Sequence, residues 1–350
     1  MLRLPWSPRR PDTQKPSLSL ALQGGGAHGA YTWGVLDRLL EAGIRIDGIS
    51  GTSAGAMDAV ALAHGWTAGG ADGARAALDD FWQAVGDSVP FHVEMLNSIN
   101  STADSALPTP MNVMMGFMRL FSPYQLNPFE LNPLRDVVRA QFDFERLRCD
   151  CPLKLFIAAT TVRTGKVRLF HTAELSEAAL LASACLPTLH HAVEIDGEHY
   201  WDGGFTANPA IYPLLYECTA PDILMVLLNP LQRDDAPRSA EDISARSMEL
   251  GFSTTFLREM RMIAHARQYI AETAGWMPLG RLERKLVGQR FHLIEARELA
   301  EAGSASKLNA ASGFLTELHT LGRSRADEWL RKQYRHVGRK ETVDVARLFL

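Results

Sequence analysis

The stretch LALQGGGAHGAYTWGVL, residues 20–36, sets four glycines in six positions between an apolar run and a segment with helical spacing. Residues 17–23 predict a short buried strand, and the apolar residues of 30–42 recur as on one face of a helix. The glycines therefore form the turn between a strand and a helix. A backbone with so few side chains lets another group come close: a phosphate, a cofactor, or a negative charge that forms during a reaction.

The same order of strand, turn and helix returns directly afterwards. Residues 44–50 predict a second strand, 51–55 a turn, and 56–64 a helix of small residues. This repetition is typical of an α/β protein with a parallel sheet. Further along, the pattern predicts strands at 153–162, 167–171, 223–228 and 292–295, a hairpin at 192–200, and helices at 69–85, 134–142, 175–184, 242–275 and 314–334.

The size and composition set limits on the class of protein. The chain has 350 residues, 46% of them hydrophobic, and a formal charge of −4. It can bury a large core, and it has no basic stripe with interleaved aromatic residues, so we expect no nucleic-acid partner. We divide it into a flexible N-terminal arm at 1–16, a catalytic domain at 17–230 with a cap or lid insertion at 89–133, and a mainly helical C-terminal region at 231–350 that packs on the catalytic domain.

Cysteine usage and hydropathy predict the compartment. The four cysteines are too few for a disulfide scaffold, and no CxxC pair indicates zinc, so we expect no metal. The basic, proline-containing N-terminus lacks the apolar core of a signal peptide. No stretch reaches the roughly 18 apolar residues of a membrane span. We expect a cytoplasmic protein.

Residues 51–55 read Gly-Thr-Ser-Ala-Gly, a G-x-S-x-G pentapeptide. A serine can be exposed at the end of a strand if the chain turns sharply into a helix, and glycines on both sides remove the Cβ atoms that would clash there. The amides at the start of the helix then point toward the serine. The strand before and the helix after it favour a catalytic Ser53 over an ordinary turn.

The glycine run has two competing interpretations. Gly24, Gly26 and Gly29 satisfy G-x-G-x-x-G. Asp47 follows at about the sequence separation at which a dinucleotide-binding fold has the acidic residue that binds the ribose. However, Gly25 makes the loop barer than that fingerprint requires, and the next strand ends in the serine turn. The other interpretation is an oxyanion hole, in which backbone N–H groups hold the oxygen that becomes negative when an ester carbonyl is attacked.

A nucleophilic serine needs a base, and residues 201–204, Trp-Asp-Gly-Gly, place a carboxylate on a tight turn. An ordinary Asx-turn remains the alternative there. Four histidines follow this turn without a motif around them, namely His265, His292, His319 and His336. For Asp202 to act on a serine its pKa must rise, most simply by burial against apolar neighbours such as Trp201.

The three motifs together, G-G-G-x-x-G, G-x-S-x-G and D-G-G, resemble the patatin-like phospholipase family from about Leu18 to Pro213. The resemblance implies a three-layer α/β/α sandwich whose central sheet is mostly parallel, with helices on both faces. It implies Ser53 as nucleophile and Asp202 as general base, without a catalytic histidine and without a cofactor. It also implies an oxyanion hole and a set of residues that support the motifs. The hole is formed by Gly24, Gly25 and Gly26, and the supporting residues are Ala27, His28, Gly29, Gly51, Thr52, Ala54, Gly55, Gly203 and Gly204.

His28 stands where many members of that family have Arg or Lys, so any positive charge in the loop would depend on its protonation. The expected activity is hydrolysis of carboxylic esters in phospholipids, lysophospholipids or related lipids. An acyltransferase or thioesterase with a histidine base, a nucleotide-binding or regulatory module, and a lipid-binding protein with an inactive site stay open as alternatives.

Two apolar segments are candidates for contact with lipid or with a second copy of the chain. The island at 111–121 is either a lipid-facing lid or a core-packing helix. The stripe along 242–275 is a cap, a dimer surface or a membrane-facing surface, or it packs on its own domain, which is the ordinary outcome for such a stripe. We expect a lipid substrate. Peripheral contact with a membrane surface and a homo-oligomer stay open.

Overall fold

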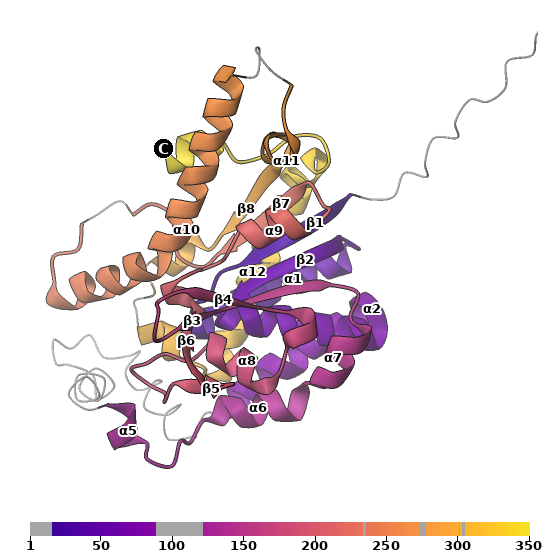
Figure 1. Ribbon diagram of the computed structural model, residues 1–350. Helices are drawn as coiled ribbons and strands as arrows, with labels where there is room; N and C mark the ends of the chain where they lie inside the picture. The colour runs from indigo at the N-terminus through magenta and orange to yellow at the C-terminus, as the bar shows by residue number, and fades with distance from the viewer. Residues whose placement is uncertain (1–15, 89–121, 234–235, 274–277, 301, 303–304) are drawn as a thin grey trace, which may run out of the picture.

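The computed structural model describes residues 16–88, 122–233, 236–273, 278–300, 302 and 305–350. The predictions for the N-terminal arm and the apolar island at 111–121 fall almost wholly outside the described residues. Within them, eight strands form one sheet in the order β5-β6-β3-β2-β1-β7-β8, and β4 also pairs with β3 (Figure 1). The strands are β1 Ser17–Leu22, β2 Arg45–Thr52, β3 Lys154–Thr161, β4 Val167–His171, β5 Val193–Ile195, β6 Glu198–Asp202, β7 Asp222–Leu227 and β8 Arg290–Glu295.

The sheet is mostly parallel, as predicted. Strands β3, β2, β1, β7 and β8 run in one direction, and β4, β5 and β6 form an antiparallel end. Successive side chains of a strand point to opposite faces of the sheet. The central strands are apolar on both sides because both faces are buried. In β7, for example, Leu224 and Val226 pack into one buried cluster, whereas Ile223, Met225 and Leu227 pack into the other.

Helices cover both faces of the sheet, which confirms the expected fold class (Figure 1). On one face lie α1 Gly29–Glu41, α2 Ala54–Asp87, α6 Pro133–Gln141, α7 Phe144–Asp150, α8 Glu177–Ser183 and α12 Ser312–Lys332. On the other lie α9 Tyr212–Glu217, α10 Ala240–Thr273 and α13 Val345–Phe349. The short helices α5 Pro123–Leu126 and α11 Arg281–Gly288 are the remaining α-helices of the described residues. None of the helices in the described ranges is long and apolar enough to cross a membrane.

Helix α2 contains the two helices that the sequence predicts at 56–64 and 69–85. The backbone leaves the helical conformation at Gly69 and at Gly70, where φ is 62°. Glycine adopts this left-handed conformation without the clash that a Cβ atom causes. The chain therefore turns there and starts a second helix without an intervening loop.

The C-terminal third of the chain is built into the sheet and its cover. Strand β8 pairs along its whole length with β7, and α12 lies against α1. The backbones of these two helices approach so closely that a Cβ on Gly34 would overlap the His319 carbonyl, and one on Gly322 the Tyr31 carbonyl. The division of the chain at residue 230 stays a prediction.

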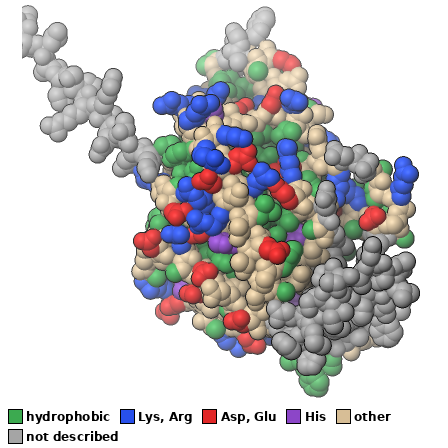
Figure 2. Space-filling model, turned by 180° about the vertical axis from the view of Figure 1, so that it is seen from behind, with side chains coloured by type: hydrophobic (Ala, Val, Ile, Leu, Met, Phe, Trp, Pro, Cys, Tyr) green, Lys and Arg blue, Asp and Glu red, His purple; other side chains and the backbone are tan. Residues whose placement is uncertain are grey.

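Charged side chains of both signs are interspersed on the face seen in Figure 2. Several ion pairs join α1 to α12, including Arg38 with Asp327 and Arg323 with both Asp37 and Glu41. These pairs hold the two helices together beside their glycine contact.

Candidate active site

Ser53 lies in a sharp turn between β2 and α2, with φ of 53° and ψ of −121°. A non-glycine residue with positive φ is strained, and such strain is typical of a nucleophile elbow. The flanking glycines fit the steric argument from the sequence. A Cβ on Gly51 would overlap the Gly55 carbonyl, and a Cβ on Gly55 would overlap the Leu22 carbonyl. The backbone N–H of Ser53 donates to the Ser183 hydroxyl oxygen at 3.0 Å.

Asp202 ends β6 and is 1% exposed. Its backbone N–H donates to the Cys185 carbonyl, and its Oδ1 accepts the Gly204 N–H at 2.7 Å. Burial raises the pKa of this carboxyl to about 7, against the lowering effects of the Gly204 N–H and of the Ser53 side chain. The Ser53 hydroxyl therefore lies near the carboxyl, although Oδ2 has no partner with full hydrogen-bond geometry among the described residues.

An aromatic ring from α10 helps to bury this carboxyl. The ring of Phe252 and the Asp202 Oδ1 both lie within 3.0 Å of the point where a Cβ on Gly204 would stand. Trp201, the neighbour expected from the sequence, contacts Phe205, which in turn packs on Phe252. The apolar cover of Asp202 thus includes a residue far outside the three motifs.

The glycine loop lies directly beside the serine turn. A Cβ on Gly24 would stand 2.6 Å from the Thr52 carbonyl oxygen and 2.8 Å from the Ser53 Cβ. The Gly24 N–H donates to the Asn208 Oδ1 at 2.7 Å. Within the described residues, the N–H groups of Gly25 and Gly26 donate to no protein acceptor. Of the three amides predicted for an oxyanion hole, two are therefore available and the first is occupied.

His28 does not carry the positive charge that a loop Arg or Lys would bring. It is 1% exposed, and its Nε2 lies 2.7 Å from the Ser306 hydroxyl. Burial, and secondly the nearby Lys307 ammonium, lower the pKa of His28 to about 4. The imidazole is consequently neutral at neutral pH.

The other predicted residues hold the three motifs against one another. Thr52 donates its hydroxyl to the Ala207 carbonyl at 2.6 Å, which ties the serine turn to the segment after Asp202. Gly29 lies against Ala54, since a Cβ on it would stand 2.7 Å from the Ala54 Cβ. Two further residues, Ala27 and Gly203, are buried beside them.

The histidines after Asp202 take part in other contacts. His265 is exposed on α10, and His292 is buried between Asp222 and Thr342. His319 stacks on Trp33 and contacts Asp37, and His336 lies beside Arg335. No hydrogen bond joins a histidine of the described ranges to Ser53 or Asp202.

Asp47 has a structural role that competes with the binding of a ribose. Its carboxylate accepts the backbone N–H groups of Thr219 and Ala220 and the Thr219 hydroxyl. Those hydrogen bonds hold the segment that leads into β7. As for metals, the described part of the chain contains no cluster of three or more side chains able to hold an ion.

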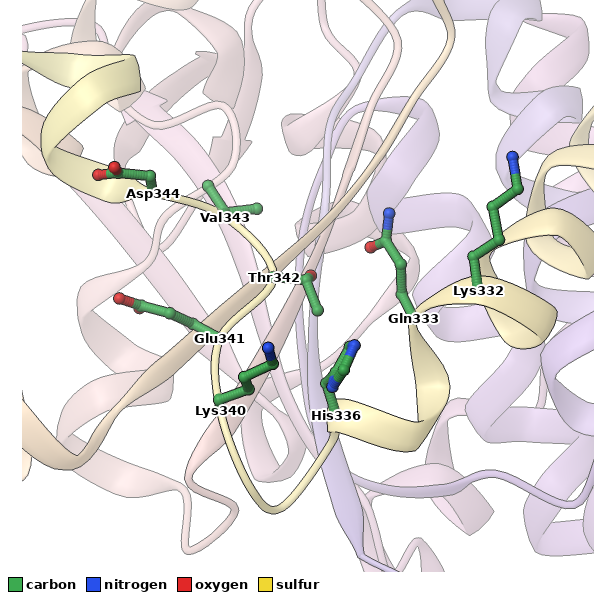
Figure 3. A pocket seen from close by; sticks show the side chains of 8 residues that line it. All are labelled: Lys332, Gln333, His336, Lys340, Glu341, Thr342, Val343 and Asp344. Atoms are coloured by element: carbon green, nitrogen blue, oxygen red, sulfur yellow. The ribbon is translucent and has the colours of Figure 1, made fainter.

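A cavity of about 630 Å³ lies apart from these motifs, among residues 332–344 near the C-terminus (Figure 3). The side chain of Lys340 points toward His336 and Thr342 in this cavity, and Glu341 and Asp344 also line it. None of the motif residues lines it.

Sequence reasoning missed five polar residues around the site: Gln23, Ser183, Asn208, Asn229 and Lys307. Two of them carried a signal, because Gln23 and Asn229 each follow the end of an apolar strand, where parallel sheets place their ligand sites. Asn208 lies within the segment that resembles the family, six residues after Asp202. Nothing in the sequence near Lys307 points to the glycine loop.

The family model described as patatin-like phospholipase matches residues 20–215. NTE family proteins of Mycobacterium bovis and Mycobacterium tuberculosis are 49% identical over 55 residues, which is 16% of this chain and 9% of the length of those relatives.

Two solved structures contain chains that are similar to this one. VipD from Legionella pneumophila is similar over 87% of this chain and 67% of its own, with 16% identity and a TM-score of 0.36. The ExoU–SpcU complex of Pseudomonas aeruginosa is similar over 96% of this chain and 74% of the compared chain, with 16% identity and a TM-score of 0.29.

Proposed function

The chain belongs to the patatin-like phospholipase family, and from this we propose that it hydrolyses carboxylic ester bonds of phospholipids, lysophospholipids or related lipids through Ser53 and Asp202. The observation that carries the proposal is the meeting of two unusual residues. A serine strained into a positive-φ turn at the start of a helix lies near a carboxyl group that is buried and titrates near neutral pH. Peripheral contact with a membrane surface, where such substrates reside, is part of the same proposal.

The reaction begins with the transfer of a proton. Asp202 accepts the proton of the Ser53 hydroxyl as Oγ attacks the ester carbonyl carbon. A base works best when its pKa lies near the working pH, and burial brings this carboxyl to that range. A solvated aspartate, with a pKa of about 3.9, would be a far weaker base.

The negative oxygen of the tetrahedral intermediate needs donors that are already in place. The N–H groups of Gly25 and Gly26 fill this role, because they donate to no protein acceptor in the described residues. The remaining predicted donor, the N–H of Gly24, holds the loop in place through its bond to Asn208 instead. The N–H that follows the nucleophile, on Ala54, is a further donor of the kind found at such elbows.

Collapse of the intermediate breaks the bond to the leaving alcohol or lysolipid, which takes the proton from Asp202. The acyl group remains on Ser53 Oγ. Water then attacks the acyl-enzyme and gives a proton to Asp202. Collapse of this second intermediate breaks the acyl bond to Ser53 Oγ, which takes that proton back as the fatty acid leaves. The cycle uses no metal and no organic cofactor.

The experiment is hydrolysis of a medium-chain p-nitrophenyl ester by wild type, Ser53→Ala and Asp202→Asn, each first checked for the wild-type unfolding midpoint. Asparagine keeps an oxygen that can accept the Gly204 N–H, so the turn should stay intact. We expect both variants to lose roughly 1,000-fold or more in kcat. For wild type, we would then measure labelling of Ser53 by a fluorophosphonate and hydrolysis of a panel of phospholipids and lysophospholipids.

The histidine-dependent alternative is tested in parallel with His265→Gln, His292→Gln, His319→Gln and His336→Gln. These four should keep their activity if they fold. If Asp202→Asn keeps its rate and one folded histidine variant loses it, the assignment of the base is wrong.

A further inference from the structure

A continuous set of buried polar contacts lies behind the glycine loop. The Lys307 ammonium donates to the Asn229 Oδ1 at 2.8 Å. The Gln23 Oε1 accepts the backbone N–H groups of Leu228 and Asn229 at 2.7 and 2.9 Å. On its other side, the Gln23 amide donates to the Asn208 carbonyl. The set therefore joins the end of β1 to the end of β7 and to the segment after Asp202.

The same set reaches the glycine loop itself, because the Asn208 side chain accepts the Gly24 N–H at 2.7 Å. Gln23, Asn208 and Asn229 are 1%, 1% and 6% exposed. Hydrogen bonds between buried polar groups are costly to break, since the freed partner finds no water. A side chain in this set thus influences the position of the loop without touching a substrate.

The short helix η5 Ala305–Leu308 contacts the loop from the side of the C-terminal region. Gly26 has φ of +60°, and a Cβ on it would overlap the Lys307 carbonyl. The Ser306 hydroxyl bonds to the imidazole of His28. Both contacts fix the distance between the loop and the Lys307 backbone.

The ammonium of Lys307 is the charge that η5 brings to this place. Its hydrogen-bond acceptor is the neutral amide of Asn229. The carboxylate of Glu249, whose charge also acts on this ammonium, is itself paired with Arg233 and Arg246. The imidazole of His28 is neutral at neutral pH. The loop thus receives positive charge from a residue about 280 positions away in the chain.

We propose that Lys307 is a positioning residue for the glycine loop, which it holds through Asn229 and Gln23 while its ammonium makes the loop more favourable for a negative oxygen. The inference rests on the proposed ester hydrolysis and adds a residue outside the part of the chain that matches the family. The oxyanion forms only during the reaction, so a poorly held loop lowers kcat while leaving KM nearly unchanged.

The test compares kcat and KM for a p-nitrophenyl ester in wild type, Lys307→Met and Lys307→Arg. Methionine keeps the apolar stem and removes the charge and the donor. We expect kcat to fall roughly 10- to 100-fold, with KM within about twofold, since a small misplacement of catalytic donors costs this much. Arginine can donate to Asn229 and should recover most of the loss.

Lys285→Met is the matched control. Lys285 is also half-buried, and it donates to the Cys218 carbonyl before β7, at the opposite end of that strand from Asn229. It should keep the wild-type kcat. Asn229→Asp keeps an acceptor for Lys307 but pairs its charge with a carboxylate, so this variant should lose kcat even if Lys307→Met does not fold.

The outcomes separate the two proposals. If wild type turns over the ester and Ser53→Ala does not, but Lys307→Met and Asn229→Asp keep kcat, the positioning role is refuted and the proposed hydrolysis stands. An equal loss in Lys285→Met also refutes it. If wild type shows neither turnover nor fluorophosphonate labelling of Ser53, the hydrolysis itself fails, and the inference fails with it.

Discussion

The pH dependence of ester hydrolysis should report the titration of Asp202. The base works only when it is ionised, and burial raises the pKa of Asp202 to about 7. Activity should therefore be complete above that pH and be lost as the pH falls through it. At pH 5.5 roughly 3% of the carboxyl groups are ionised for a pKa of about 7, so kcat/KM should be about 30-fold below its plateau.

Replacing Phe252 by alanine should move this profile in a direction that identifies the base. The ring lies over Gly204 and within the cover of the Asp202 carboxyl, so its removal lets water approach. Hydration favours the charged form, which lowers the pKa of a carboxyl group and raises that of an imidazole. If the pKa falls to about 6, roughly 24% of the sites are ionised at pH 5.5, an eightfold gain relative to the plateau.

The assay is kcat/KM for a soluble ester between pH 4.5 and 9, normalised to each variant's own plateau. Met262→Ala is the control, since Met262 lies on the same helix with its side chain 67% exposed. Its profile should coincide with that of wild type. A shift of the Phe252→Ala profile to higher pH would refute the carboxylate base and indicate a histidine.

Three further predictions concern the packing of the site and its cover. Gly24→Ala should reduce kcat by roughly 100-fold, as measured by ester turnover, because its Cβ would displace the serine turn; unchanged turnover in the folded variant would contradict the close approach. Gly322→Ala should lower the free energy of unfolding, measured with urea, by roughly 2 kcal/mol because its Cβ would meet the α1 backbone. Gly313→Ala, on the same helix with open space around it, should not lower it. An equal loss in both variants would be evidence against the contact between the helices. Burial raises the pKa of Glu259, which accepts the N–H groups of Ile211 and Tyr212, to about 7. A raised carboxyl pKa stabilises the fold at low pH and loses that effect as the pH rises from about 4.5 through 7, so the Tm of wild type relative to Glu259→Gln should fall over this range; a constant difference would contradict it.

The sequence predicts those parts of the fold that depend on local pattern. The predicted strands at 17–23, 44–50, 153–162, 167–171 and 223–228 all occur, because short alternating or continuous apolar runs beside turn-forming residues favour buried strands. The turn at Ser53 is also predictable from local sequence. Its flanking glycines, all within five residues, lack the Cβ atoms that would clash in such a turn. Its strained backbone is what that pentapeptide leads one to expect.

What could not be predicted depends on contacts between distant segments. Phe252 belongs to the apolar stripe of a long helix, and nothing in that stripe indicates which residue meets Gly204. The occupied amide of Gly24 follows from the placement of Asn208, which depends on how the segment after β6 returns past β1. The His28 imidazole is neutral because η5 covers it, and its motif alone says nothing of that cover.

During translation, β1 cannot form all of its strand pairs until β7 has been synthesised. This strand lies between β2 and β7, and it pairs with β7 from Leu18↔Asp222 onward. At a synthesis rate of about 5–20 residues per second, one edge of β1 waits roughly 10–40 s for its partner to be made. During that interval the open edge can pair with another nascent chain. The yield of folded protein should therefore depend on the rate of translation and on chaperones that shield this edge.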